Sequence, residues 1–443
     1  MIAKTRYLAA CLSLALLISA CATPSPVETQ DIASQPSPGS PTDAPAQVIP
    51  PTNTPTLPPS PTALEVQAPA ATDTPLPEFA SPPLVHLTSG TEPYLIELKM
   101  FDALAGWAVG GLDGSRDHLF TTRDGGNTWQ EVTPPQPGAP GALEAATFFM
   151  DASTAWATFS NLDTLLPEWP IVWHTTDGGQ TWLPGQALDL SDLSQSYASD
   201  LFFVDAQQGW LLTHVGAGMS HDYVVLFRTT DGGLTWQRLL DPYNDGQIQA
   251  CQKTGLLFID SQTGWLTGDC GGVMAGAFLN RTQDGGLTWT YIDLPAPADQ
   301  PLLYDVNSWA ACGSYDLHFF DSQNAVLGVR CTLYSQDSSE PSFAHYTYTT
   351  LDGGATWSSQ PYPGGTLLFV TPQQGWALAG DIYQTFDGGA TWTRVNEVHW
   401  EASFNFISPQ LGWAASYTNT EHALVATTDG GAHWFMLAPV IAP

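Results

Sequence analysis

The chain has 443 residues, with 11 Lys and Arg against 43 Asp and Glu, so its formal net charge is −32. Such an acidic surface repels phosphate backbones and anionic headgroups, which argues against nucleic acid as a partner and against membrane binding through basic patches. The 17 Trp and 40 Gly, with only 12% charged residues, are unusual for a helical protein.

The first twenty residues predict an export signal. Lys4 and Arg6 form its positive end, and the apolar run from Tyr7 to Ile18 is too short to span a bilayer. The string Leu-Ile-Ser-Ala before Cys21 resembles the bacterial lipoprotein signal, which is cleaved before a lipid-bearing cysteine. We therefore expect a signal peptide over residues 1–20, lipidation of Cys21 and an extracytoplasmic chain anchored to the bacterial cell membrane. An ordinary signal peptide is the alternative.

Residues 21–83 follow as a segment rich in Pro and Thr. The 62 residues after Cys21 hold 17 Pro and no Lys or Arg. Such a composition cannot bury a core. We expect a disordered stalk that lifts a folded domain away from the membrane.

One short string, Ser/Thr-x-Asp-Gly-Gly-x-Thr-Trp, recurs seven times in the remaining chain, with His433 in place of Thr in the last copy. Its aspartates are Asp124, Asp177, Asp231, Asp284, Asp352, Asp387 and Asp429. A Gly-Trp pair precedes five copies, at Trp107, Trp210, Trp265, Trp376 and Trp413. Ala155-Trp156 and Ala325-Val326 occupy the same place in the other two copies.

The repeat predicts an all-β fold. Short apolar runs bounded by turn residues indicate strands, and each repeat holds four of them. Residues 84–443 give about 51 residues for each repeat, close to the roughly 40 to 50 residues of a propeller blade. We therefore predict a monomeric seven-bladed β-propeller over residues 84–443.

Four cysteines form two pairs with matching offsets. Cys251 and Cys270 flank Asp260, and Cys312 and Cys331 hold the same offsets from Asp321. In a hairpin that turns just after each Asp, the members of each pair lie nearly opposite. Since exported chains are oxidised, we expect Cys251–Cys270 and Cys312–Cys331 disulfides. Free thiols or a metal site are the alternative.

The recurring string resembles the Asp-box, or bacterial neuraminidase repeat. In families that carry it, the box lies on the outer rim between the third and fourth strands. The aspartate there is structural, because a short acidic side chain accepts hydrogen bonds from turn amides and the glycines adopt positive φ. The seven aspartates are therefore interpreted as structural.

The pairing of Gly-Trp strands with these boxes most resembles the photosystem II stability and assembly factor family of seven-bladed propellers. The resemblance spans about residues 95–443, and it implies a non-enzymatic chaperone that binds an assembling membrane protein through an Arg cluster. Here Arg123, Arg228 and Arg281 adjoin the boxes, whereas the others lie in different repeats, so that cluster does not carry over. The others are Arg116, Arg238, Arg330 and Arg394.

A sialidase or another glycoside hydrolase is the enzymatic alternative. Sialidases with such boxes need three converging Arg, a Tyr nucleophile paired with Glu, an Asp that acts as the acid, and an Arg-Ile-Pro string. That string is absent here. No catalytic residue is assigned, and a protein-binding or recognition platform is preferred over catalysis. A glycan-binding propeller remains open.

Ligand-binding candidates lie in the longer connections between predicted strands, which share one face of a propeller. One of these connections is the insert from Cys331 to His345. The candidates are Arg116, His118, Tyr243, Trp309, Tyr334 and Trp400. No metal site or cofactor is expected; clustered acids could hold calcium, but no complete calcium loop is present. The partner, a protein or a glycan, is not identified by these residues.

Overall fold

The computed structural model describes residues 86–443 apart from short gaps at 136–142, 162–169, 219–220, 243–247, 272–275, 306–307, 309, 336–337 and 419–420. The expected signal peptide, Cys21 and the stalk lie outside the described residues. All the described residues belong to one compact unit, which is the subject of the description below.

The described residues form strands and no helix, as the all-β prediction requires. The first three groups are β1–β4 (Tyr94–Met100, Gly106–Gly111, His118–Thr122, Thr128–Glu131), β5–β8 (Leu143–Phe149, Ala155–Asn161, Trp173–Thr175, Leu183–Pro184) and β9–β12 (Tyr197–Phe203, Gly209–Gly218, His221–Thr229, Gln237–Arg238). Each is an antiparallel ladder in chain order.

The later groups repeat this plan. They are β13–β16 (Gln252–Phe258, Gly264–Asp269, Phe278–Thr282, Thr290–Tyr291), β17–β20 (Ala310–Phe319, Ala325–Ser335, Ser338–Thr350, Ser358–Pro361), β21–β24 (Thr366–Phe369, Gly375–Leu378, Asp381–Thr385, Thr393–Glu397) and β25–β28 (Glu401–Phe406, Gly412–Tyr417, His422–Thr427, Phe435–Met436). A single pair, Asp269 with Gly313, joins β14 to β17. The last strand, β29 (Val440–Ile441), pairs in parallel with β4.

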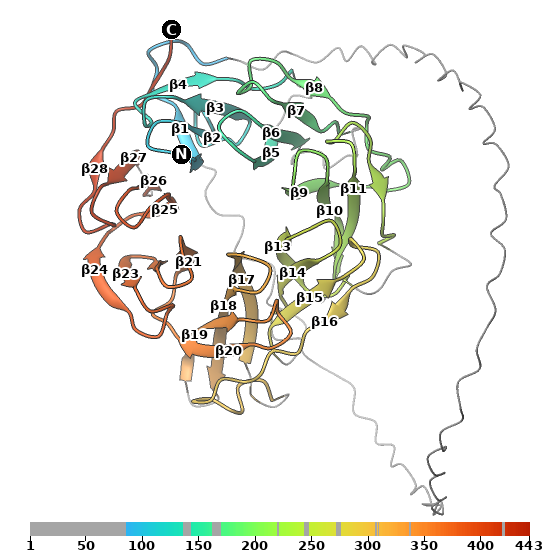
Figure 1. The fold of residues 1–443 in the computed structure, drawn as a ribbon, viewed down its shortest axis with the longest axis vertical. Helices are drawn as coiled ribbons and strands as arrows, with labels where there is room; N and C mark the ends of the chain where they lie inside the picture. Colours follow the sequence, from blue (N-terminus) through green and yellow to red (C-terminus); the bar gives the residue numbers. More distant parts are fainter. Residues whose placement is uncertain are drawn as a thin grey trace, which may run out of the picture. The chain divides into compact units, whose positions relative to one another are not determined.

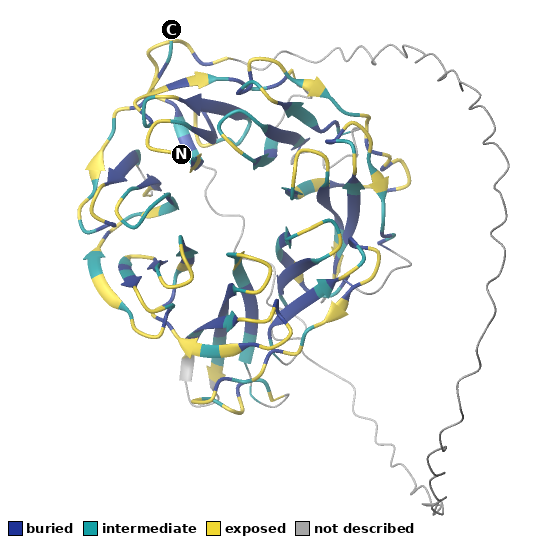
Figure 2. Cartoon of the chain, viewed as in Figure 1, coloured by how far each residue is buried: buried dark blue, intermediate teal, exposed yellow. Residues whose placement is uncertain are grey.

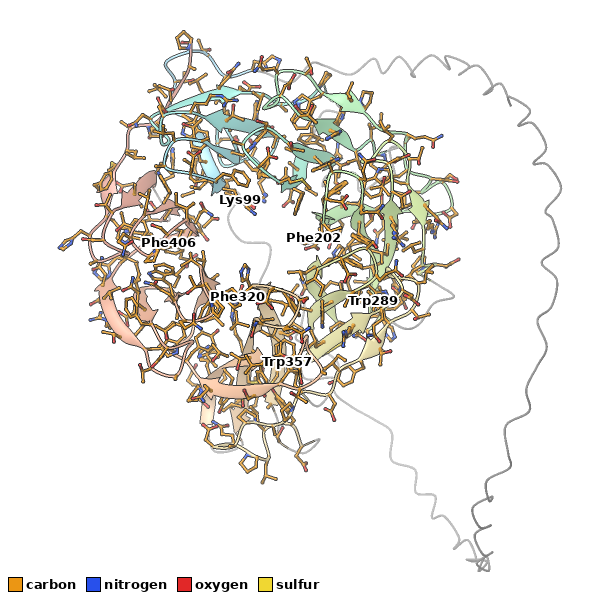
Figure 3. All side chains as sticks on the ribbon, viewed as in Figure 1. Lys99, Phe202, Trp289, Phe320, Trp357 and Phe406 are labelled. Carbon is orange, nitrogen blue, oxygen red and sulfur yellow. A yellow bond between two sulfur atoms is a disulfide. The ribbon has the colours of Figure 1, made fainter. Side chains whose placement is uncertain are left out.

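The four-strand groups follow one another around a common centre (Figure 1). The first strand of each group lies nearest the centre and the fourth lies on the outside. Lys99, Phe202 and Phe320 lie around that centre, whereas Trp289 and Trp357 lie farther out among the sheets (Figure 3). The second and third strands are the most buried and the outer strands are largely exposed (Figure 2).

The seven Asp-Gly-Gly turns share one hydrogen-bond pattern. In the first, Thr128 donates its backbone N–H to Asp124 Oδ1 at 2.9 Å and its hydroxyl to Oδ2 at 2.8 Å, while Gly126 N–H donates to Thr122 Oγ1 at 3.0 Å. Gly125 and Gly126 both have positive φ, which glycine adopts without strain. In the last turn, His433 replaces the threonine and its Nδ1 lies 2.6 Å from Asp429 Oδ2.

Both predicted disulfides are confirmed. Cys312 and Cys331 face each other in the β17–β18 ladder, and Cys251 and Cys270 lie just outside the ends of β13 and β14. The sequence separation is 19 residues in both pairs.

In one place the structure differs from the sequence interpretation. The insert from Cys331 to His345 was expected as a connection, but β18 and β19 continue through most of it. The apolar Cys331 and Leu333 alternate with more polar neighbours. This pattern is typical of a strand, in which successive side chains point to opposite faces. No helix in the described part of the chain could cross a membrane.

Candidate functional site

The β18–β19 hairpin extends beyond those of most other groups. β18 has 11 residues and β19 has 13, against 4 and 5 in β22 and β23. Its far end lies at the same end of the sheet as the connection from β16 to β17, because Ala310, where β17 begins, pairs with Leu333 near the end of β18. This places a long hairpin beside a long connection.

A groove of about 610 Å³ lies between these two elements. Its walls are Gln300, Pro301, Leu302, Leu303, Asp305, Ser308 and Leu333. Leu302 is 72% exposed, whereas Leu303 is buried and anchors the connection in the core. The groove therefore presents an apolar surface to solvent.

Two aromatic side chains near the far end of the hairpin are also exposed. Tyr334 is 54% exposed and Phe343 is 64% exposed. Phe343 pairs with Thr332 and shares its face of the hairpin, whereas Leu333, next to Thr332, belongs to the other face. The register shifts just after Leu333, at Tyr334. The hairpin thus presents apolar side chains on both faces.

A network of tyrosines holds the connection against β19. Tyr348 donates its hydroxyl to the carbonyl oxygen of Pro295 at 2.7 Å, and Tyr304 Oη lies 2.9 Å from Tyr348 Oη. Tyr346 donates to Asp299 Oδ2 at 3.2 Å. Burial raises the pKa of Tyr346 and of Tyr348 to about 12. The hydroxyls of Tyr346 and Tyr348 therefore stay protonated well into the alkaline range, and they hydrogen-bond the framework of the groove.

The disulfides strengthen the same region. The Cys312–Cys331 bond links β17 to β18 two residues before Leu333, and the Cys251–Cys270 bond links the ends of β13 and β14 in the preceding group. A cross-link of this kind limits the disorder of the unfolded chain and holds the two strand ends together.

The residues predicted from the sequence do not converge. Arg116 is paired, with its Nη2 2.7 Å from Glu97 and its Nε 3.4 Å from Glu144. His118 is only 3% exposed, and its Nδ1 lies 2.6 Å from Asp117 Oδ1.

Trp400 is half-buried, and its ring centre lies 5.7 Å from those of Phe404 and Trp434, so it belongs to local packing. Tyr243 and Trp309 lie outside the described residues. Of the six candidates, Tyr334 alone belongs to the hairpin beside the groove.

Sequence reasoning missed the groove residues Leu302 and Leu333, and also the exposed Phe343 on the hairpin. The Pro-Leu-Leu run at residues 301–303 was an available signal, because an apolar run within a polar connection is either buried or used for binding. In the described ranges, no three His, Cys, Asp or Glu side chains are grouped so that they could hold a metal ion.

Four-stranded antiparallel groups arranged around a centre define a β-propeller. No family model and no curated protein matches the chain. Among solved structures, it is similar to YCF48 bound to D1 peptide, with 19% identity, a TM-score of 0.46 and coverage of 78% of this chain and 95% of that one.

YCF48 from Cyanidioschyzon merolae is similar at 16% identity and a TM-score of 0.43, with 78% and 97% covered. The polysaccharide lyase Uly1 is similar at 10% identity and a TM-score of 0.50, with 76% and 90% covered. These likenesses concern the fold, and a shared propeller fold does not transfer a function.

Proposed function

We propose that this propeller is a binding platform that holds a polypeptide partner in the groove beside the β18–β19 hairpin. The observation that carries the proposal is the exposed apolar groove around Leu302 and Leu333, held by buried tyrosine hydroxyls and a disulfide. Apolar surface that is exposed on a rigid frame is typical of an interaction site.

The surrounding charge indicates the chemistry of the partner. Asp299 and Asp305 belong to the connection that forms the groove, and no Lys or Arg occurs between Arg281 and Arg330. An acidic rim favours cationic partners and repels anionic ones. The partner segment therefore presents an apolar side chain flanked by Lys or Arg.

The proposal includes the finer features predicted from the sequence. The chain would be a seven-bladed propeller with Asp-box turns, carried on a stalk over residues 21–83 and anchored through lipidated Cys21 outside the cytoplasm. Two disulfides support an oxidising compartment. The repeats' resemblance to the assembly-factor family implies the same kind of protein-binding role.

The test uses the mature chain with its disulfides intact and fluorescent 12-residue peptides that carry a central Leu between Lys pairs. Peptides with a central Ser, or with Glu flanks, serve as ligand controls. Leu302→Asp should weaken binding of the Lys-flanked peptide by about tenfold or more, since a buried Leu contributes roughly 1.5–3 kcal/mol.

Leu351→Asp is the matched protein control. Leu351 is 79% exposed and follows the opposite end of β19, so the same charge is introduced in the same group but away from the groove. Equal binding by the two variants, or no binding of any peptide, would contradict the proposal. Binding of polysaccharides in place of peptides would support the glycan-binding alternative.

A further inference from the structure

Three polar side chains on successive strands of one group form a continuous hydrogen-bonded chain. Ser199 lies on β9, His214 on β10 and Asp222 on β11. His214 Nε2 lies 2.9 Å from Ser199 Oγ, and His214 Nδ1 lies 2.7 Å from Asp222 Oδ1. Both imidazole nitrogens are thus engaged, one with a hydroxyl and the other with a carboxylate.

Two β-bulges create this alignment. The register between β9 and β10 shifts so that Ser199 is the extra residue between Ala198 and Asp200. The register between β10 and β11 shifts just after His214, with Val215 as the extra residue, and Gly216 follows with a φ of 154° that suits glycine. Bulges re-aim side chains and are frequent beside active sites.

The carboxylate is fixed and ionised. Asp222 is buried, and its Oδ2 accepts the backbone N–H of Lys253 at 3.0 Å. Burial raises the pKa of Asp222, but the hydrogen bond with His214 and the charges of His214 and Lys253 outweigh burial and lower it. An ionised carboxylate on Nδ1 keeps the proton there and leaves Nε2 free to accept one.

The imidazole is held while the hydroxyl stays accessible. His214 is buried beneath Tyr197, whose ring stacks on it with centroids 4.7 Å apart, whereas Ser199 is exposed. Ser199 Oγ also donates to Asp200 Oδ2 at 2.7 Å. The hydroxyl proton therefore has to rotate toward His214 Nε2, 2.9 Å from Oγ, before it can be transferred there.

We propose that Ser199, His214 and Asp222 form a triad that hydrolyses short-chain carboxylic esters. Ser199 Oγ attacks the ester carbonyl carbon and its proton moves to His214 Nε2. The carbonyl–alkoxy bond then breaks, and Nε2 returns the proton to the departing alcohol. Water attacks the acyl-serine, one proton passes through Nε2 back to Oγ, and the carboxylic acid leaves.

A small cavity lies beside the histidine and the aspartate. It measures about 110 Å³, touches His214 and Asp222, and is lined further by Gln195, Ser196, Tyr197, Gly216 and Ala217; Ser199 itself does not line it. Gln195 Nε2 would lie 3.2 Å from a Cβ placed on Gly216, so its side-chain amide faces the cavity and can donate to a carbonyl oxygen. An acyl group on Ser199 that reached into this cavity would be limited to a few heavy atoms.

The experiment treats the mature chain with a fluorophosphonate, which labels activated serines, and maps the adduct by mass spectrometry. It also measures hydrolysis of p-nitrophenyl acetate and p-nitrophenyl octanoate. We expect the label on Ser199, preference for acetate, and loss of both label and hydrolysis in Ser199→Ala.

Ser191→Ala is the matched control, because Ser191 is exposed and its Oγ lies 2.8 Å from Asp189, a serine–aspartate pair like Ser199 with Asp200. Its labelling and hydrolysis should equal those of the unaltered chain. Asp222→Asn, the positioning variant, should lower kcat by up to about 10⁴-fold with little change in KM.

A folded chain that is labelled elsewhere, or one whose acetate hydrolysis is unchanged in Ser199→Ala, would overturn the proposal. Thermal unfolding of each variant separates loss of the triad from loss of the fold, and the adduct on the unaltered chain requires no variant. The test is independent of peptide binding, because Leu302 and Leu333 lie in other strand groups.

Discussion

Trp413 donates its indole N–H to the carbonyl oxygen of Gly125 at 3.0 Å, although 288 residues separate the two. Gly125 is the first glycine of an Asp-Gly-Gly turn in the first strand group, and Trp413 lies on the second strand of the last group. This bond joins the last strand group to the first.

The same relationship recurs between neighbouring groups. The indole N–H groups of Trp156, Trp210 and Trp376 donate to Gly232, Gly285 and Gly430 in the next group, at 2.8 to 2.9 Å. With Trp413, these are four groups in which the tryptophan of one repeat bonds to the Asp-Gly-Gly turn of the following one. In these groups the tryptophan and the turn thus act together across the boundary between repeats.

Replacing Trp413 with Phe should lower the free energy of unfolding by about 1 kcal/mol from the hydrogen bond, plus the cost of the smaller ring. Trp265→Phe is the matched control, because Trp265 Nε1 is buried without a hydrogen-bond partner. Urea unfolding of both variants measures the difference. Equal losses would show that the indole bond contributes nothing beyond packing.

Deleting residues 440–443 should destabilise the first group. Val440 N–H donates to Asn127 O, Ala442 N–H donates to Trp129 O, and the buried Ile441 side chain packs in that group's core. Losing the Ile side chain alone costs roughly 1.5–3 kcal/mol. The deletion should therefore lower the melting temperature more than Ile441→Ala does; an unchanged melting temperature would refute a structural role for β29.

The turn aspartates should make the fold sensitive to acid. Hydrogen bonds from Thr356 hold the pKa of Asp352 at about 2, below its ordinary value of 3.8. Because the folded-state pKa is the lower one, this stabilisation is present above about pH 4 and is lost as the pH falls through about 2. All seven turn aspartates shift in this direction.

Asp352→Asn should accordingly lower the melting temperature at pH 7, and the difference from the unaltered chain should shrink toward pH 2. Asp113→Asn removes the same charge at an exposed position outside these turns and should show little effect at either pH. Melting curves between pH 2 and 7 test this. A difference in melting temperature that does not vary with pH would contradict the conclusion that the ionised Asp352 carboxylate stabilises the fold.

Removing the Cys312–Cys331 bond by Ser substitution at both positions should cost about 3 kcal/mol, from loop entropy in the unfolded chain. Because the bond lies two residues from Leu333, the variant should also bind the Lys-flanked peptide more weakly. Cys251 and Cys270 changed to Ser give the comparison with equal loop length. If both variants bind the peptide equally well, the Cys312–Cys331 bond stabilises the fold but does not contribute specifically to binding in the groove.

The recurring string was enough to predict the fold class from the sequence. The hydrogen bonds of each Asp-Gly-Gly turn join residues no more than four positions apart, so they depend on neighbours in the chain. The cysteine pairs were predictable for the same reason, since a short hairpin fixes which residues face each other.

The sites depended on contacts that the repeat does not encode. Leu302 in a connection and Leu333 in a hairpin line one groove, and nothing in their local sequence specifies that arrangement. Ser199, His214 and Asp222 align only because two bulges break the regular register, and a bulge has no reliable sequence signal. Local hydrogen bonds thus determined the strands and turns, whereas packing between segments decided where binding and chemistry can occur.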